Sequence, residues 1–467
     1  MSDTELGFLS ITDASARLAD KSLSPLDLVS ALIARTERLD PQLNSYLLPC
    51  FDQAMDAARK AEADISTKGM RGPLHGIPFG LKDIIDTAGI RTTCHSKILA
   101  DNVPTHDAEV AARLARAGAI MMGKLATHEF AFGGPSFDLP WPPARNPWNT
   151  AHHPGGSSSG AGASVAAGLL PGALGSDTGG SVRNPASCCG LVGMKPTYGR
   201  VPRTGVFPLA YSLDNVGPLT RTVRDNAMLM QVLAGFDAQD PASADTPVPD
   251  YCASIGADVK GLRIGVIRHF HTKDMIADAE VAAGIDDVVQ VLSGLGAKVH
   301  DTQLRPLDVY QGGNRIILTV EGFAVHRRWL MERPADYAQL TREKLLPGAF
   351  ISGPDYVDAL RMRSKLRDEF AQHMRDFDAL ICVSSMETPC RIDDDAEAAR
   401  TYPRQARAAF NYLGCPAMSV PCGFHSNGLP LSVQIVGKAF DEAMLYGVAA
   451  AYEAATPWHE QHPKMSV

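Results

Sequence analysis

Hydrophobic residues recur at helical spacing in several stretches of the chain. After Ser24 and Pro25, the residues Leu28, Leu32 and Leu39 fall near a 3.6-residue period, and serine followed by proline is a typical helix start. Alanine-rich or amphipathic patterns with the same period occur further along the chain. Besides the helix that begins at Pro25, the sequence predicts helices over 51–65, 157–170 and 278–292.

Short apolar runs between these helices predict strands. They lack the helical period and are bounded by Gly, Pro or polar residues, which favours buried strands. Near the C-terminus Asn427-Gly428 is a hairpin signal, and Leu431, Val433 and Ile435 alternate after it. Strands that alternate with helices indicate an α/β fold. The expected strands are 76–83, 173–176, 262–267, 297–299 and 379–383.

Two stretches show no regular pattern. Residues 134–156 are rich in proline, which indicates an ordered loop. Residues 236–257 have an excess of Asp, Pro, Ala and Ser, which is typical of a linker or a long surface loop. We interpret 236–257 as a surface excursion and the whole chain, 1–467, as a single domain.

Composition and charge exclude several classes of protein. The 467 residues are 45% hydrophobic and 21% charged, as in ordinary globular proteins, and the net charge of −8 offers no footprint for nucleic acid or anionic lipid. The 9 cysteines form no CxxC pair, and the N-terminus is acidic where a signal peptide is basic. We therefore expect a cytoplasmic protein with reduced thiols and with neither a nucleic-acid partner nor a membrane anchor.

Two glycine-serine loops are the candidate site. Gly155-Gly156-Ser157 precedes a predicted helix, and Gly179-Gly180-Ser181 follows a predicted strand. Glycines allow main-chain N–H groups to point into a cavity, as a backbone oxyanion hole requires. No formal charge occurs between His153 and Asp177, and the stretch lacks the apolar density of a membrane span. Its neutrality is typical of a tightly packed glycine-rich site.

Other interpretations of this region are weaker. Ser158 lies in a G-x-S-x-G pattern, but the hydrophobic strand that a nucleophile elbow needs does not precede it, and no P-loop lysine follows. The pairs His152-His153 and His269-x-His271 lack further ligands at useful spacing, so no metal site is predicted. Cys188 and Cys189 are interpreted as small buried residues, and Arg183 as a structural partner of Asp177.

Several motifs together resemble the amidase signature family. The resemblance covers nearly the whole chain and is densest from about 70 to 235. The motifs are GIPFGLKD at 76–83, NPWN at 146–149, GGSSSG at 155–160, GSDTGGSVR at 175–183, CGLVGMKPT at 189–197, DNVGP at 214–218 and GCPAMSVP at 414–421.

The resemblance implies a three-layer α/β/α fold with a central mixed sheet and a Ser-cisSer-Lys triad. It places the lysine at Lys82, the cis-serine at Ser157 and the nucleophile at Ser181. It also implies that the N–H groups of Thr178, Gly179, Gly180 and Ser181 hold an oxyanion. Phe132 falls at the position of a pocket wall, and neither a metal nor an organic cofactor is implied.

Alternatives for single residues stay open. Lys82 could be structural, paired with Asp83 or Asp86, and Ser157 could merely cap the helix that follows it. Tyr310, Trp329 and Tyr337 lie in the least family-like segment, 305–360. Each aromatic either reaches the substrate or packs in the core.

The chemistry follows from the lack of histidine at both loops. A lysine serves as a base only when it is neutral, and burial among glycines and serines lowers its pKa. Ser157 would then pass the proton from Ser181 to Lys82, and Ser181 would form an acyl-enzyme that water hydrolyses. The sequence thus predicts a hydrolase that cleaves carboxylic amides.

Three functions are compatible with this chemistry. The preferred one is a free-standing amidase that acts on a small or aryl amide, a carbamate or a ureide. The alternatives are the glutaminase-type subunit of a tRNA-dependent amidotransferase and a silent scaffold. Filled triad positions disfavour the scaffold. Relatives of the amidotransferase type carry Asn-Met near Ala126-Thr127 and a different segment at 408–412, which disfavours the glutaminase-type function. The possibility of a homodimer is left open.

Overall fold

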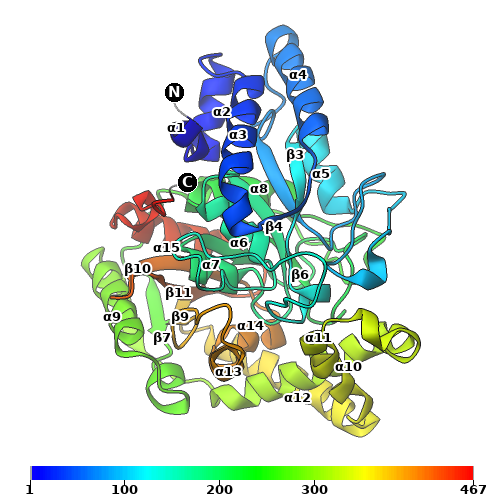
Figure 1. Ribbon diagram of the computed structural model, residues 1–467. Coiled ribbons are helices and arrows are strands. Elements are labelled where there is room, and N and C mark those ends of the chain that lie inside the picture. The colour runs from blue at the N-terminus through cyan, green and yellow to red at the C-terminus, as the bar shows by residue number, and fades with distance from the viewer. Residues whose placement is uncertain (1–2, 466–467) are drawn as a thin grey trace.

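The computed structural model describes residues 3–465, and its centre is a mixed sheet of 11 strands (Figure 1). In spatial order the strands are β1 Tyr46–Pro49, β3 Ile120–Leu125, β2 Pro78–Lys82, β4 Gly172–Asp177, β6 Asn215–Thr220, β5 Val192–Lys195, β10 Ala417–Phe424, β11 Pro430–Val436, β9 Ala379–Val383, β7 Arg263–Val266 and β8 Lys298–Asp301. β2 runs parallel to β3 and β4, β7 runs parallel to β8 and β9, and the other pairs are antiparallel.

Helices cover both faces of this sheet, which confirms the three-layer α/β/α fold. One layer contains α6 (Ser159–Ala166) and α7 (Arg183–Cys189), which pack on each other and on the central strands. The opposite layer contains α8 (Val223–Leu233), α9 (Ala279–Gly294) and α15 (Glu442–Ala454). The strands between the layers are almost wholly buried, as their near-continuous apolar sequences predict.

The remaining helices form two groups at the ends of the sheet (Figure 1). The N-terminal group is α1 Asp3–Gly7, α2 Ile11–Ala19, α3 Pro25–Leu43, α4 Phe51–Lys68 and α5 Glu109–Ala117. The second group is α10 Leu307–Glu332, α11 Gln339–Leu345, α12 Gly353–His373, α13 Asp395–Thr401 and α14 Arg407–Leu413. α10 packs against α11, α12 and α14. No helix of the described residues is both long enough and apolar enough to cross a bilayer.

Most predicted elements occur close to their expected bounds. α3 begins at Pro25, and Ser24 caps it by accepting the N–H groups of Leu26 and Asp27. The hairpin around Asn427-Gly428 joins β10 to β11. The helix predicted over 157–170 is shorter, because it begins only at Ser159 and ends at Ala166. Ser157 therefore lies outside the helix and does not cap it.

The segment 236–257 is anchored to the molecule at several points. Arg113 donates hydrogen bonds to the carbonyls of Leu233, Gly235 and Phe236 where the segment begins. Tyr251, near its end, is fully buried, with its ring 5.6 Å from that of Tyr446. The segment lacks strands of the sheet and contains one short turn of 3-10 helix, Cys252–Ser254.

Candidate active site

Lys82 is the last residue of β2 and is completely buried. Its Nζ donates hydrogen bonds to Ser157 Oγ at 2.6 Å and to Ser176 Oγ at 2.9 Å. Ser176 lies in β4, the strand next to β2, so the sheet itself holds the amine and one of its two partners. Sequence analysis missed Ser176, although it stands inside the GSDTGGSVR motif.

Burial changes the ionisation of Lys82. Loss of water around the amine lowers its pKa to about 7, although the charges of Asp177 and Asp214 oppose this shift. The alternative that Lys82 pairs with Asp83 is wrong, because Asp83 pairs instead with Lys124, whose Nζ lies 3.3 Å from its carboxylate. Lys82 and Lys124 are thus both buried but have different contacts. Lys124 neutralises a carboxylate, whereas Lys82 contacts hydroxyl groups.

Ser157 is held in a tightly filled loop. The peptide bond between Gly156 and Ser157 is cis, and the backbone N–H of Gly156 donates to Asn184 Oδ1 at 2.8 Å. The backbone N–H of His128 donates to the carbonyl of Ser157 at 3.0 Å. A Cβ atom on Gly156 would lie 2.1 Å from the His128 ring, so only glycine fits there. The Ser157 hydroxyl is therefore fixed against Lys82.

Ser181 lies between β4 and α7, beside the first loop. The backbone N–H of Ser158 donates to the Ser181 carbonyl at 3.3 Å and so connects the two glycine-serine loops. Ser181 is half-buried, whereas Ser157 and Lys82 are buried. Among residues 3–465 its Oγ has no hydrogen-bond partner, and the hydroxyl is free to turn toward a ligand.

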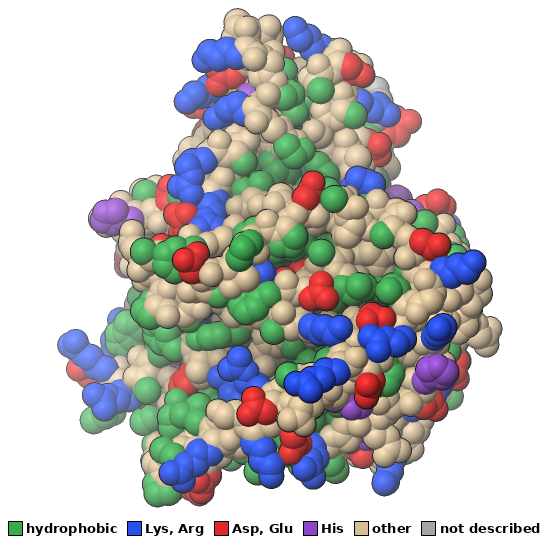
Figure 2. Space-filling model, turned by 180° about the vertical axis from the view of Figure 1, so that it is seen from behind, with side chains coloured by type: hydrophobic (Ala, Val, Ile, Leu, Met, Phe, Trp, Pro, Cys, Tyr) green, Lys and Arg blue, Asp and Glu red, His purple; other side chains and the backbone are tan. Residues whose placement is uncertain are grey.

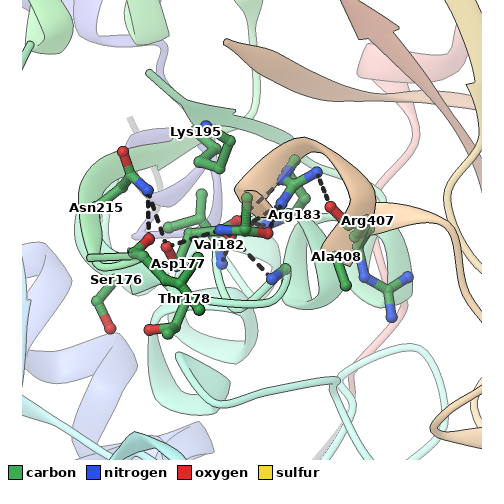
Figure 3. Close-up of polar contacts among 12 residues, drawn as sticks. Ser176, Asp177, Thr178, Val182, Arg183, Lys195, Asn215, Arg407 and Ala408 are labelled. Carbon is green, nitrogen blue, oxygen red and sulfur yellow. Dashed lines mark hydrogen bonds and ion pairs between the residues drawn. The ribbon is translucent and has the colours of Figure 1, made fainter. Parts of the chain in front are cut away.

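The loop that carries Ser181 is folded around the carboxylate of Asp177. This group accepts the N–H groups of Gly180, Val182 and Arg183 and the guanidinium of Arg183 (Figure 3). Burial alone would raise the pKa of Asp177, but the charge of Arg183 and these hydrogen bonds hold it well below its usual range. Arg183 is the structural partner of Asp177 that the sequence predicts.

The backbone N–H groups that are free near Ser181 differ from those expected to hold the oxyanion. The N–H of Gly180 is committed to Asp177 Oδ1 at 2.8 Å, so Gly180 is corrected from an oxyanion donor to a structural residue of the loop. Its φ of 124° and its close packing against Arg407 explain why glycine is needed. Within the described part of the chain, the N–H groups of Thr178, Gly179 and Ser181 have no acceptor.

A cavity of about 150 Å³ adjoins this site on the side of Ser176 and Thr178. Its wall is largely the loop 203–209 together with Ile84 and Ala131, which sequence analysis did not single out. Thr178 donates its hydroxyl to Asp214, and burial raises the pKa of Asp214 to about 6. The cavity is mostly apolar with a few polar groups in its wall, as in many small-molecule sites.

The aromatic residues considered as pocket walls do not line this cavity. Phe132 is half-buried at the end of the turn Glu129–Ala131 and does not line this cavity, whereas its neighbour Ala131 does. Tyr310 and Tyr337 are buried core residues. Trp329 stacks on Phe207, a wall residue, at 6.2 Å and so supports the cavity from behind.

The histidine pairs contact backbone or protein side chains. His152 Nδ1 lies 2.8 Å from the carbonyl of Pro389, and His153 Nδ1 accepts the N–H of Gly155 at 3.0 Å. His269 lies 3.9 Å from Asp274, and His271 is buried. No group of three His, Cys, Asp or Glu side chains within 3–465 is arranged to hold a metal ion. Burial also raises the pKa of the Cys188 thiol to about 12, which disfavours a thiolate nucleophile.

Comparison with known proteins assigns the chain to a family. Residues 27–446 match the family model of the amidases. A glutamyl-tRNA(Gln) amidotransferase subunit from Moorella thermoacetica is 38% identical over 99% of this chain and 100% of its own length. A bacterial aryl acylamidase of the amidase signature family superposes with a TM-score of 0.88 at 26% identity, over 97% of this chain and 98% of its own. The corresponding amidotransferase subunit from Thermotoga maritima gives a TM-score of 0.77 at 30% identity, over 98% and 95%.

The match to the amidase family model and the likeness to the aryl acylamidase define the class, an enzyme that hydrolyses C–N bonds of amides. The chain belongs to the amidase signature family.

Proposed function

We propose that the protein hydrolyses amides through an acyl-enzyme on Ser181, with Ser157 and Lys82 as the proton relay. The observation that carries this proposal is the 2.6 Å hydrogen bond between Lys82 Nζ and Ser157 Oγ at a fully buried amine. With a pKa of about 7, a large part of Lys82 is neutral at physiological pH and able to accept a proton.

In this mechanism Ser181 Oγ attacks the amide carbonyl while its proton passes through Ser157 to Lys82. The N–H groups of Thr178, Gly179 and Ser181 are the available donors for the oxyanion, and Thr178 also lines the adjoining cavity. The relay then returns the proton to the leaving nitrogen, and the C–N bond breaks. Water, deprotonated by the same relay, hydrolyses the ester on Ser181 and restores the enzyme.

Two substrate classes are supported by different observations. A free-standing amidase that acts on a small or aryl amide is supported by the greater structural likeness to the aryl acylamidase than to the Thermotoga maritima amidotransferase protein. The second candidate, a glutaminase-type subunit of a tRNA-dependent amidotransferase, is supported by 38% identity to such a protein over its full length. The first function would turn over its amide without a partner. The second would release ammonia from glutamine and depend on a partner subunit.

An activity screen tests both. The purified chain is assayed for amine or ammonia release from acetanilide, aliphatic amides, amino-acid amides, carbamates and glutamine. We expect turnover of at least one amide by the chain alone, and loss of about 1,000-fold or more in Ser181→Ala, as for other serine nucleophiles. Ser158→Ala, the matched control, should retain far more activity. Hydrolysis of glutamine only, or none without an added partner, would favour the glutaminase-type function, and an active Ser181→Ala would contradict the mechanism.

A further inference from the structure

Arg407 is a buried cation that no carboxylate neutralises. It is 3% exposed, begins α14 and donates through Nη1 to the hydroxyl groups of Ser384 and Ser385. Its Nε is buried without a partner. Among residues 3–465 no carboxylate lies within 4.0 Å of its guanidinium, in contrast to Arg183, which pairs with Asp177 at 2.9 Å. A buried guanidinium with unused donors is costly unless an anion binds it.

This cation lies beside the nucleophile. A Cβ atom placed on Gly180 would be 2.6 Å from Arg407 Nε, so the guanidinium stem rests on the residue that precedes Ser181. Figure 3 shows the side chain of Arg407 pointing away from the Asp177–Arg183 ion pair, while only its carbonyl accepts a bond from Arg183. Arg407 therefore takes no part in the ion pair that stabilises the loop.

Among residues 3–465 the more distant charge of Asp177 favours the charged form of Arg407, but the closer polar groups offer no carboxylate. Burial and the neighbouring charges of His152 and Arg407 lower the pKa of His153 to about 4, so that ring is neutral at physiological pH. The ring of Tyr402 lies 6.3 Å from His153 and 5.3 Å from Lys344 Nζ. Lys344 donates to the carbonyl of Gly133 and, within the described residues, has no salt-bridge partner either. Burial lowers the pKa of Arg407 to about 10, which leaves it protonated.

We propose that Arg407 binds a carboxylate of the substrate and that the protein prefers amides that carry a second, anionic carboxylate end. This inference rests on the proposed function, because it places the anion next to the serine that attacks the amide. A guanidinium presents paired N–H donors that match the two oxygens of a carboxylate, and within 3–465 Nε of Arg407 is buried without a partner. A neutral isostere would leave these donors unpaired and bind less well.

The test compares succinamate with 4-methylpentanamide, in which an isopropyl group replaces the carboxylate. We expect the wild type to prefer succinamate in kcat/KM by about tenfold or more. Arg407→Gln should reduce this preference at least about tenfold, and Arg407→Lys should restore part of it. Arg404→Gln is the matched control, since Arg404 lies three residues earlier but pairs with Glu387 at 3.0 Å. Its preference should equal that of the wild type.

A second measurement does not depend on the variants folding. Succinate should slow the labelling of wild-type Ser181 by a fluorophosphonate, and acetamide at the same concentration should not. Equal turnover of the two amides, an equal loss for both in Arg407→Gln, or no protection by succinate would overturn the role of Arg407. If Ser181 is neither labelled nor needed for any hydrolysis, the proposed function itself fails. Glutamine also carries a carboxylate, so a preference for glutamine over succinamate that is lost in Arg407→Gln would support the carboxylate site.

Discussion

Lys82 shows how position alone changes the pKa of an ordinary side chain. The amine has no carboxylate within salt-bridge distance among the described residues, and its hydrogen bonds go to the neutral hydroxyl groups of Ser157 and Ser176. Desolvation disfavours the ammonium form, and the more distant charges of Asp177 and Asp214 recover only part of the loss. Lys124 differs, because its Nζ lies 3.3 Å from the carboxylate of Asp83.

This leads to a prediction for the pH dependence of turnover. Because the neutral amine is the competent form, kcat/KM should rise with pH up to the Lys82 pKa of about 7 and level off on the alkaline side. Lys82→Arg should be nearly inactive, because its guanidinium stays protonated. Initial rates from about pH 5 to 9 measure this. A rate that does not depend on pH on the acid side, or an active Lys82→Arg, would contradict the relay.

At the scale of elements, the buried Asp177–Arg183 pair joins β4, α7, α14 and β11. Arg183 donates to Asp177, to the carbonyl of Arg407, to Asn411 and to Gln434. Figure 3 shows Arg183 between Asp177 and the carbonyl of Arg407. Removing one partner of a buried ion pair leaves the other charge buried and alone.

We therefore predict that Arg183→Met lowers the free energy of unfolding by about 3 kcal/mol or more, because it strands the Asp177 carboxylate. Arg391→Met is the control, since Arg391 pairs with Asp393 on the surface and both are more than half exposed. It should leave the urea midpoint nearly unchanged. Equal midpoints for the two variants would show that the pair does not stabilise the loop.

The sequence predicts elements better than it predicts contacts. The strand 379–383 and the start of α3 at Pro25 follow from apolar runs and from helix capping, which are local signals. The role of Gly180 was misjudged because its N–H is taken by Asp177, a contact set by the fold of the loop. Ser176 and Arg407 were missed for the same reason. Neither residue type is distinctive until the sheet and α14 place it beside the site.

At the scale of the molecule, one sheet contains strands from before and after the segment 236–257. β5 comes before it and β10 after it, and the two are hydrogen-bonded neighbours. The space-filling view in Figure 2 shows positive and negative side chains interspersed over the face that it presents, and neither sign forms a large patch there.

We expect the chain to behave as a single domain. Proteolytic nicking within 236–257 should leave the two fragments associated, because the β5–β10 pair and the buried Tyr251 hold them together. Size-exclusion chromatography of the nicked protein, with and without urea, measures this. Two fragments that separate in native buffer and each unfold cooperatively would show two domains instead.

The most direct test of the central claim is the site of covalent labelling. The wild-type chain is treated with a fluorophosphonate, digested and mapped by mass spectrometry. The mechanism predicts one modified residue, Ser181, with labelling that slows strongly in Lys82→Ala while that variant keeps its far-ultraviolet circular dichroism. Modification of Ser158 or another serine, or an active enzyme that takes no label at Ser181, would contradict it.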